Sequence, residues 1–549
     1  MACRAAHQAP GAADMTTAGL NPRTPVLIGV GQAAERLEDP GYAGLSPIAL
    51  AVQAARAAVA DSQANADAVI AAVDTIAATR QFENSSARAV APLGKSTKFP
   101  LSVAHRLGVA PKRAVLDVVG GQSPQHLVSE FSRAIEAGSA DVVLLVGAEA
   151  ISTIRHYAGT EDKADFSDDP AGSMEDRGFG LTGLVTPALV AHGIGAPSTQ
   201  YALLENARRA AQGRGRGEYA AAMGALFAPF TEVAARNPFS AAPLRRSADE
   251  LVTATERNRM IADPYPRFLV ARDQVNQGAA VLLASADAAH RLGVAQDKWV
   301  FLHGQADLVE RTMLERRVLG QAPSAVAAVR HALEVARVGV DDIDFFDLYS
   351  CFPIAVSNII DALGMSASDP RGLTLTGGLP FFGGAGNNYS MHAIAEAVAR
   401  VRSRAGSFAL VSANGGMLSK TSVGVYSTTP TPWRPDRSAL LQREIDDADA
   451  PAVTERATGW ATIESYTVVY GRKGTTGIVI GRLKSDDSRF VAKVAEGDDE
   501  LLGMLQYADE PVGQPIYVSA LDAGNCVGMS RSRITHDASR GPVGVGPVT

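Results

Sequence analysis

The side chains that could carry chemistry stand where expected strands run into glycine-rich turns. In the first such segment, a β-branched run from Ala114 reaches Gly120, Gly121 and Gln122, and an expected helix follows. A helix that begins there would direct free N–H groups and the positive end of its dipole at a thiolate or another anionic group. Gly120 has no side chain, and Ser123 has no obvious base beside it. Covalent catalysis by a side chain is therefore not expected at this turn.

A second turn follows the expected strand 345–349 and carries Tyr349, Ser350 and Cys351. The Tyr349 hydroxyl is a hydrogen-bond donor that suits a carbonyl oxygen. Cys351 is the only cysteine inside the expected α/β core. Burial as a small apolar side chain is the commoner role of such a cysteine, and nucleophilic chemistry is the alternative.

Two later turns add amide groups and one histidine. Asn387 and Asn388 stand near an expected helix start, and His392 follows about two helical turns beyond Gly384. A lone histidine in such a helix is usually structural. The last turn, 412–417, contains Asn414, which cannot move a proton near neutral pH. The candidate catalytic residues are therefore Tyr349, Cys351, Asn387, Asn388 and His392.

Arginines gather in the middle of the chain, where the alternation of strands and helices breaks. Their guanidinium forks suit phosphate groups, and a solvated helix face is the alternative. The tight turn 213–217 favours the phosphate contact. The residues concerned are Arg208, Arg209, Arg214 and Arg216, with Arg245, Arg246, Arg257 and Arg259 nearby in the sequence.

A glycine pattern at residues 29–34 superficially matches a dinucleotide-binding turn. That motif needs a helix that opens inside it and an acidic residue after the next strand. Here residues 35–40 interrupt, and a helix is expected only near Ser46. Binding of NAD is therefore disfavoured.

Length, charge and cysteine content disfavour several further classes of protein. With 549 residues the chain is too long for one hydrophobic core, so two to four domains are expected. A net charge of −7 argues against a nucleic-acid binder. Three cysteines give neither a disulfide framework nor a zinc spacing, which favours the reducing cytoplasm. No apolar run reaches the length of a membrane span, so no contact with a membrane is expected.

Strands and helices alternate in two similar series, which predicts a duplicated α/β unit. We expect one half at 25–285, with an insertion at about 151–277, and a second half at 286–429. The Pro-rich stretch 430–435 opens a further module of short alternating strands to residue 530, expected to be a small barrel of OB type. Residues 1–24 and 531–549 are expected to be tails, and Met15 is an alternative start.

Four of these segments resemble the thiolase superfamily. Where thiolases carry the nucleophilic cysteine this chain has Gly120, and where they carry the activating histidine it has Gly384. The second cysteine position corresponds to Ala413, and Cys351 and Phe352 match a thiolase motif. The best local match lies within 257–283. The closest likeness is to thiolase-like proteins of the mycobacterial kind, which have an extra C-terminal domain and are often named acetyl-CoA acetyltransferase.

The resemblance implies a duplicated, five-layered αβαβα fold and a ligand of the acyl-CoA class. It implies no permanent cofactor, no metal, and an assembly with itself or with thiolase-like or hydratase-like partners. Standard thiolysis is not expected because the three reactive positions are replaced. An acyltransferase or retro-aldol lyase with non-covalent chemistry is the alternative. Contacts with the ligand are expected from Gly120, Gly121, Gln122, Asn414, Arg208, Arg214 and Arg216.

Overall fold

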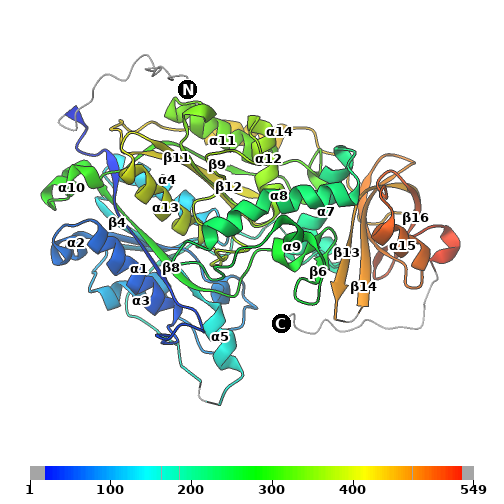
Figure 1. Ribbon diagram of the computed structural model, residues 1–549, viewed down its shortest axis with the longest axis horizontal. Coiled ribbons are helices and arrows are strands. Elements are labelled where there is room, and N and C mark those ends of the chain that lie inside the picture. The colour runs from blue at the N-terminus through cyan, green and yellow to red at the C-terminus, as the bar shows by residue number, and fades with distance from the viewer. Residues whose placement is uncertain (1–18, 162, 183, 185, 473, 535–549) are drawn as a thin grey trace.

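The computed structural model describes residues 19–534, except 162, 183, 185 and 473. The predicted α/β architecture is confirmed in it: two sheets and their helices form the body of the molecule, and a smaller sheet domain lies at one end (Figure 1). Met15 and most of both expected tails lie outside the described residues.

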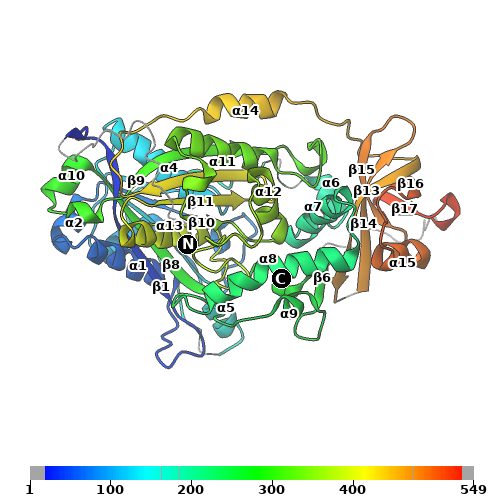
Figure 2. The same cartoon turned by 45° about the horizontal axis from the view of Figure 1, so that its top comes forward.

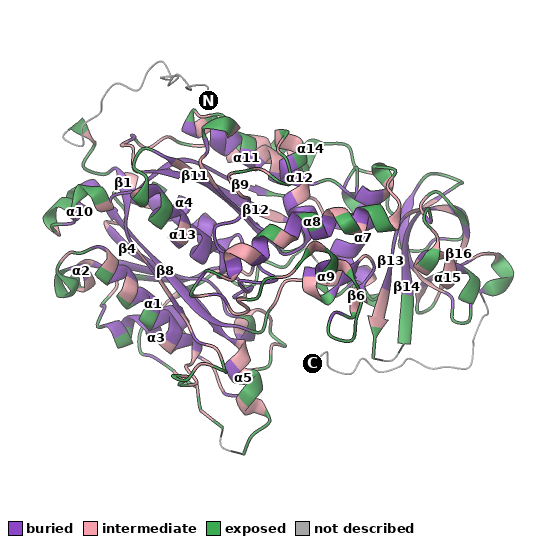
Figure 3. Cartoon of the chain, viewed as in Figure 1, coloured by how far each residue is buried: buried purple, intermediate pink, exposed green. Residues whose placement is uncertain are grey.

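The sheet of the first half is mixed and almost wholly buried. Its strand β4 is a continuous apolar run, VVLLVGAEA, as expected for a strand that is covered on both faces. Figure 3 shows the burial of β4 and its neighbour β8. In spatial order the strands are β1 (Pro25–Ala34), β8 (Asn276–Ser285), β4 (Val142–Ala150), β2 (Thr75–Ala78), β3 (Arg113–Leu116) and β5 (Glu175–Asp176).

The sheet of the second half repeats this arrangement. Its strands run in the order β9 (Phe301–Val309), β12 (Lys420–Ser427), β11 (Phe408–Gly415) and β10 (Phe345–Leu348). Strand β9 pairs with β12 antiparallel and β10 with β11 parallel, as β1 pairs with β8 and β2 with β4. The same order and the same directions support the predicted duplication.

Together with the two sheets, the helices form a structure of five layers. The central layer contains α4 (Ser123–Glu136) and α13 (Tyr389–Ser403), which contact both sheets. Helices α1 (Pro47–Asp61) and α3 (Phe99–Leu107) cover the outer face of the first sheet, and α11 (Pro323–Ala336) covers the second, beside α12 (Pro353–Leu363). Helix α1 begins where expected, with Ser46 as its N-cap. Each central helix begins at one of the glycine-rich turns.

The insertion between β4 and β8 is mostly helical. It contains α5 (Ile151–Ala158), α6 (Pro187–Ala191), α7 (Pro197–Ala211), α8 (Arg216–Ala234), α9 (Ala248–Val252) and the short strands β6 (Met260–Ala262) and β7 (Tyr265–Pro266). Helices α7 and α8 lie between the body and the sheet domain (Figure 1). The insertion therefore bridges the two parts of the molecule.

The C-terminal domain is a closed sheet of five strands. Helix α14 (Ser438–Asp447) spans the distance from the body to it (Figure 2). Its strands are β13 (Gly459–Gly471), β14 (Gly474–Leu483), β15 (Arg489–Val494), β16 (Pro515–Leu521) and β17 (Gly524–Gly528), with α15 (Asp499–Tyr507) between the third and fourth. The ring closes because β13 pairs with both β14 and β16, while β17 joins β15 to β16.

The sheet of this domain continues into the insertion. Beyond β16 and β13 it adds β6 and β7, through the antiparallel partners Val469 and Ala262. Arg216 of α8 reinforces the junction through an ion pair with Asp263, 2.8 Å apart, and a hydrogen bond of 2.8 Å to the Tyr466 hydroxyl. The domain is thus joined to the body by backbone pairing as well as by side chains.

Candidate active site

The turn between β3 and α4 is built around Gly120. Its φ of +145° lies in a region that residues with a side chain rarely adopt. Its N–H donates to Asn387 Oδ1 at 2.9 Å, and Asn387 Nδ2 donates to the Arg80 carbonyl at 2.6 Å. The backbone donor that was expected to face a thioester is therefore already occupied. Asn387 of the second half reaches across to this N–H, and the contact of Gly120 with a ligand stays a prediction.

Side chains fill the space beside this turn. A methyl group on the Cα of Gly120 would overlap Gln122 Oε1, and one on Gly415 would overlap the same atom. A methyl group on Gly121 would overlap the Tyr349 hydroxyl. The position that would receive a reactive side chain is therefore occupied by Gln122, and Tyr349 stands over the next residue.

Several polar atoms at the turn remain without partners among the described residues. Gln122 Oε1 and Asn414 Oδ1 are buried acceptors that make no hydrogen bond. The N–H groups of Gly121 and Gln122 at the start of α4 also have no acceptor there. Buried groups of this kind normally find a partner, so the site can offer both donors and acceptors to a bound molecule.

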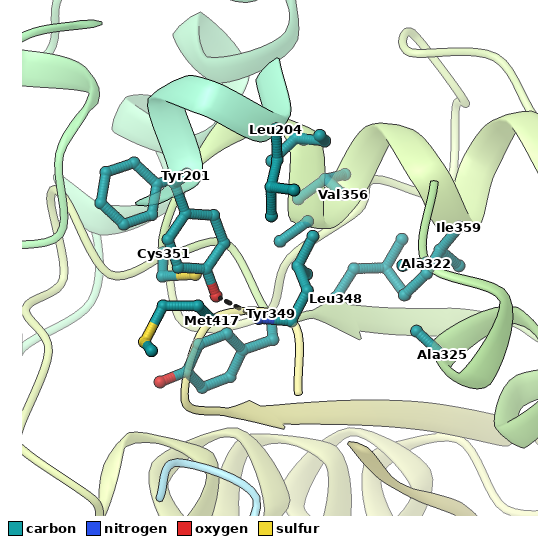
Figure 4. Close-up of a cluster of buried hydrophobic side chains, with 14 of the residues drawn as sticks. Tyr201, Leu204, Ala322, Ala325, Leu348, Tyr349, Cys351, Val356, Ile359 and Met417 are labelled. Carbon is teal, nitrogen blue, oxygen red and sulfur yellow. Dashed lines mark hydrogen bonds between the residues drawn. The ribbon is translucent and has the colours of Figure 1, made fainter. Parts of the chain in front are cut away.

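Helix α7 of the insertion places Tyr201 in the same site (Figure 4). Its ring stacks on Phe352 with 4.2 Å between centroids. Its hydroxyl accepts from Asn414 Nδ2 at 2.7 Å and from the N–H of Leu418 at 3.1 Å. Sequence reasoning missed Tyr201, because a tyrosine in a long amphipathic helix carries no signal of its partner in a distant turn.

Cys351 and Tyr349 are buried and keep their protons. Burial raises the pKa of the Cys351 thiol to about 12, and it lies 3.8 Å from Asn414 Nδ2. Burial also raises the pKa of Tyr349 well above its usual value. Its ring meets that of Tyr389 edge-on with 5.4 Å between centroids. Near neutral pH both groups are neutral, so Cys351 is a weak nucleophile and Tyr349 is a donor.

His392 and Asn388 serve the packing of the central layer. His392 Nδ1 lies 2.7 Å from Gln32 Oε1, and complete burial lowers its pKa to about 3. Asn388 Nδ2 donates to the Gly147 carbonyl at 2.7 Å, which ties the two halves together. Among the described residues, neither side chain makes a hydrogen bond to the Gly120 turn.

Gly384 lies in a loop, and Ala413 lies in a buried strand. The Gly384 N–H donates to the Arg272 carbonyl at 2.7 Å, so the glycine loop is anchored to the end of the insertion. Ala413 is fully buried in β11, paired with Ser422. Neither position offers a group that could accept or donate a proton.

The arginines of the insertion have structural partners. Arg208 is ion-paired with Asp361 of α12, and Arg216 joins α8 to the C-terminal domain. Their guanidinium groups are therefore engaged, which does not support the phosphate contacts expected of them. The side chain of Arg214, which lies 3.4 Å from Glu218, is more exposed than those of Arg208 and Arg216. It lines a hollow of about 180 Å³ between α7, α8 and α12.

A charged cluster lies on the far side of α4. His126 contacts Asp307 of β9 at 3.4 Å and Glu130 at 3.6 Å. Burial lowers the pKa of His126, but the hydrogen bond to Asp307 and the charges of Asp117 and Glu130 prevail and raise it to about 9. His126 is therefore positively charged at neutral pH and links the two halves.

The structure thus brings together Gly120, Gly121, Gln122, Tyr349, Cys351, Asn387 and Asn414, and it keeps Asn388, His392, Arg208, Arg214 and Arg216 apart from them. Among residues 19–534, apart from the four that are not described, no cluster of side chains could hold a metal ion. Within the same residues no helix has the length and apolar character that crossing a membrane requires.

Comparison with known proteins adds a family and a set of folds. Residues 440–522 match the model of the thiolase-like protein type 1 additional C-terminal domain. No curated protein matches the chain. A crystal structure of a monomeric SCP2-thiolase-like protein type 1 from Mycobacterium smegmatis is 47% identical, with a TM-score of 0.80, and the match covers 93% of this chain and 100% of that one.

Two more distant structures share the fold alone. The Ltp2-ChsH2(DUF35) aldolase is 19% identical with a TM-score of 0.54, and the match covers 74% of this chain and 98% of that one. Human mitochondrial 3-ketoacyl-CoA thiolase in complex with CoA is 16% identical with a TM-score of 0.50 over 74% and 98% of the two chains.

Proposed function

Because the chain belongs to the family of SCP2-thiolase-like proteins of type 1, we propose that it binds an acyl-CoA or a related thioester without performing standard thiolysis. The observation that carries this proposal is the turn at Gly120. The place of a nucleophile is filled by Gln122, and the thiol that remains nearby, Cys351, is protonated and buried. Covalent catalysis needs an activated nucleophile, and this site supplies none.

Binding is supported by the polar groups that the site leaves free. The N–H groups of Gly121 and Gln122 suit a thioester oxygen, and the acceptors of Gln122 and Asn414 suit the amide N–H groups of a pantetheine arm. A human thiolase of the same fold is known in complex with CoA. Of the arginines first considered for the phosphates, Arg214 is the one that keeps an open surface.

Thermal-shift and calorimetric titrations with CoA, acetyl-CoA and a longer acyl-CoA test the proposal. We expect a saturable rise in melting temperature, because a ligand that binds only the folded state stabilises it. Gln122→Met, which keeps the bulk but removes the acceptor, should weaken binding, whereas the exposed Arg245→Gln serves as the control. Thiolysis of acetoacetyl-CoA at rates typical of thiolases, or no binding of any of the three ligands, would overturn the proposal.

An acyltransferase or a retro-aldol lyase with non-covalent chemistry is the second candidate. It is favoured by the neutral hydroxyl of Tyr349 beside the free N–H groups of the turn, since both can stabilise a developing oxyanion. On this candidate, Tyr349→Phe abolishes turnover of a β-hydroxyacyl-CoA while the protein stays folded. Full turnover in that variant would eliminate it.

We also propose that the chain is a monomer, in place of the assembly first expected. The M. smegmatis relative is monomeric. In this chain β5 pairs with β3 and so covers what would otherwise be the edge of the first sheet. Light scattering coupled to gel filtration tests this. The strand order of the C-terminal domain, with a helix between its third and fourth strands, further supports the assignment of an OB-type barrel.

A further inference from the structure

A polar cavity of about 360 Å³ lies beside the segment that leads into β8. Its walls come from the loop Glu35–Glu38, from Ser152, Arg155 and His156 of α5, and from Arg272 to Asn276. The lining shares no residue with the Gly120 turn. Nothing in the proposed thioester site therefore explains why these side chains are gathered here.

One cation in this cavity has no direct ion pair. Among the described residues no carboxylate lies within ion-pair distance of the Arg272 guanidinium, which is partly buried. Burial and the neighbouring positive charges of Arg267 and Arg246 lower the pKa of Arg272, and together they outweigh the carboxylates of Glu38 and Asp273, which raise it. A guanidinium in this setting gains free energy when an anion approaches it.

A buried amide in the same wall is also unsatisfied. Asn276 is 1% exposed, and its Oδ1 accepts from the N–H of Thr153 at 2.9 Å. Its Nδ2 therefore faces away from that bond, and it makes no hydrogen bond with any described residue. A buried donor without an acceptor costs about 1–3 kcal/mol, so a ligand oxygen is its natural partner.

The other charged groups of the cavity are largely matched. Arg155 holds Asp273 through two hydrogen bonds, of 3.3 and 2.6 Å, and Arg36 lies 3.4 Å from Asp39. The Glu35 carboxylate accepts backbone N–H groups of its own loop, at 3.1 and 2.6 Å. The remaining acid, Glu38, is exposed and has no ion pair among the described residues.

We propose that this cavity binds the oxyanion of a small anionic molecule, a phosphate or a carboxylate, with Arg272 and Asn276 Nδ2 as the donors. The cavity is larger than a single ion requires, so a ligand with further polar atoms fits. This inference does not rest on the proposed thioester binding.

The position of the cavity gives its ligand an influence on the candidate active site. The Arg272 N–H donates to the Leu379 carbonyl at 3.1 Å, and the Arg272 carbonyl accepts from Gly384 at 2.7 Å. Both partners belong to the glycine loop that ends at Asn387. An anion bound to Arg272 therefore holds the segment before β8 that anchors this loop.

Titration of the full chain with inorganic phosphate, pyrophosphate and citrate, at constant ionic strength set by chloride, tests the proposal. We expect saturable binding of at least one of these anions by calorimetry, with a matching rise in melting temperature. Arg272→Gln should raise its Kd at least tenfold. Asn276→Asp, which keeps the acceptor for Thr153 but removes the donor, should do the same. The matched control is Arg245→Gln, an exposed position outside the cavity lining, which should keep the Kd within twofold.

Each outcome of these titrations either supports or overturns the proposed anion site. No saturable binding by the wild-type protein, or equal binding by the wild-type protein and by both Arg272→Gln and Asn276→Asp, would overturn the site. If one variant fails to fold, the other decides. If CoA displaces the bound anion, the oxyanion that the cavity binds belongs to CoA. If CoA does not displace it, the ligand is a free anion. Either result supports the proposed site. Failure of these titrations leaves the thioester proposal standing, because they contain no thioester.

Discussion

Replacing Gly120 by cysteine puts back the thiol that thiolases carry, and the structure predicts that the change harms the protein without restoring activity. Two costs add. A residue with a side chain at φ +145° is strained by about 1–3 kcal/mol. Its Cβ would also overlap Gln122 Oε1, and overpacking of a buried site costs about 1–3 kcal/mol more. Together these give a loss of about 2–6 kcal/mol in the free energy of unfolding.

Urea unfolding of four proteins separates the two costs: wild type, Gly120→Cys, Gln122→Ala and the double variant. Gln122→Ala makes room for the new side chain, so the double variant should recover the overpacking cost and keep the backbone strain. Neither protein that contains the Gly120→Cys change should cleave acetoacetyl-CoA, because no residue at position 384 activates the thiol. A Gly120→Cys protein as stable as the wild type would refute the steric argument. Restored thiolysis would refute the interpretation of the site as lacking a base.

Three further changes test other parts of the structure. The folded-state pKa of His126 is about 9, above its ordinary 6.5. The stability that its charge adds is therefore full below pH 6.5 and is lost as the pH rises through 9. In urea unfolding, His126→Gln should lower the free energy of unfolding by about 1 kcal/mol at pH 6 and by almost nothing at pH 10. Tyr201→Phe removes a hydroxyl that serves Asn414 and Leu418 and should cost about 2–4 kcal/mol; an unchanged unfolding midpoint would contradict this. Arg216→Met leaves the Asp263 carboxylate buried and unpaired and should cost about 3–5 kcal/mol, seen as early proteolysis between the body and the C-terminal domain; wild-type resistance would contradict it.

The sequence predicted most of the architecture because the signals involved are local. The apolar runs at 142–147 and 408–412 and the cap at Ser46 each depend on neighbouring residues, and the repeat of the pattern indicated the duplication. Of the barrel strands, β17 has the weakest local signal. It is a five-residue segment, Gly-Asn-Cys-Val-Gly, with glycine at both ends, and it becomes a strand only because β15 and β16 flank it.

The candidate site was predictable only in part. Gly120, Tyr349 and Asn414 were expected near strand ends and Asn387 near a helix start, and the elements lie accordingly, but the partners of these residues could not be read from the sequence. Asn387 reaches the Gly120 N–H from the other half of the chain, and Tyr201 arrives from the insertion. Such contacts depend on how distant segments pack. The ion pairs of Arg208 and Arg216 could not be read from the sequence for the same reason, because a contact with a remote aspartate leaves no trace in local sequence.

The pairing of β13 with β6 has a consequence for how the chain is made. Strand β6 leaves the ribosome long before β13, so during synthesis it has an open edge while the whole second half is still being translated. The N-terminal segments can collapse early, but this part of the insertion must wait for the last domain. An unpaired strand edge attracts other chains, which makes this interval the period of greatest risk of misassembly. Premature termination within residues 430–530 should therefore yield a chain that aggregates, rather than a shorter chain that folds normally.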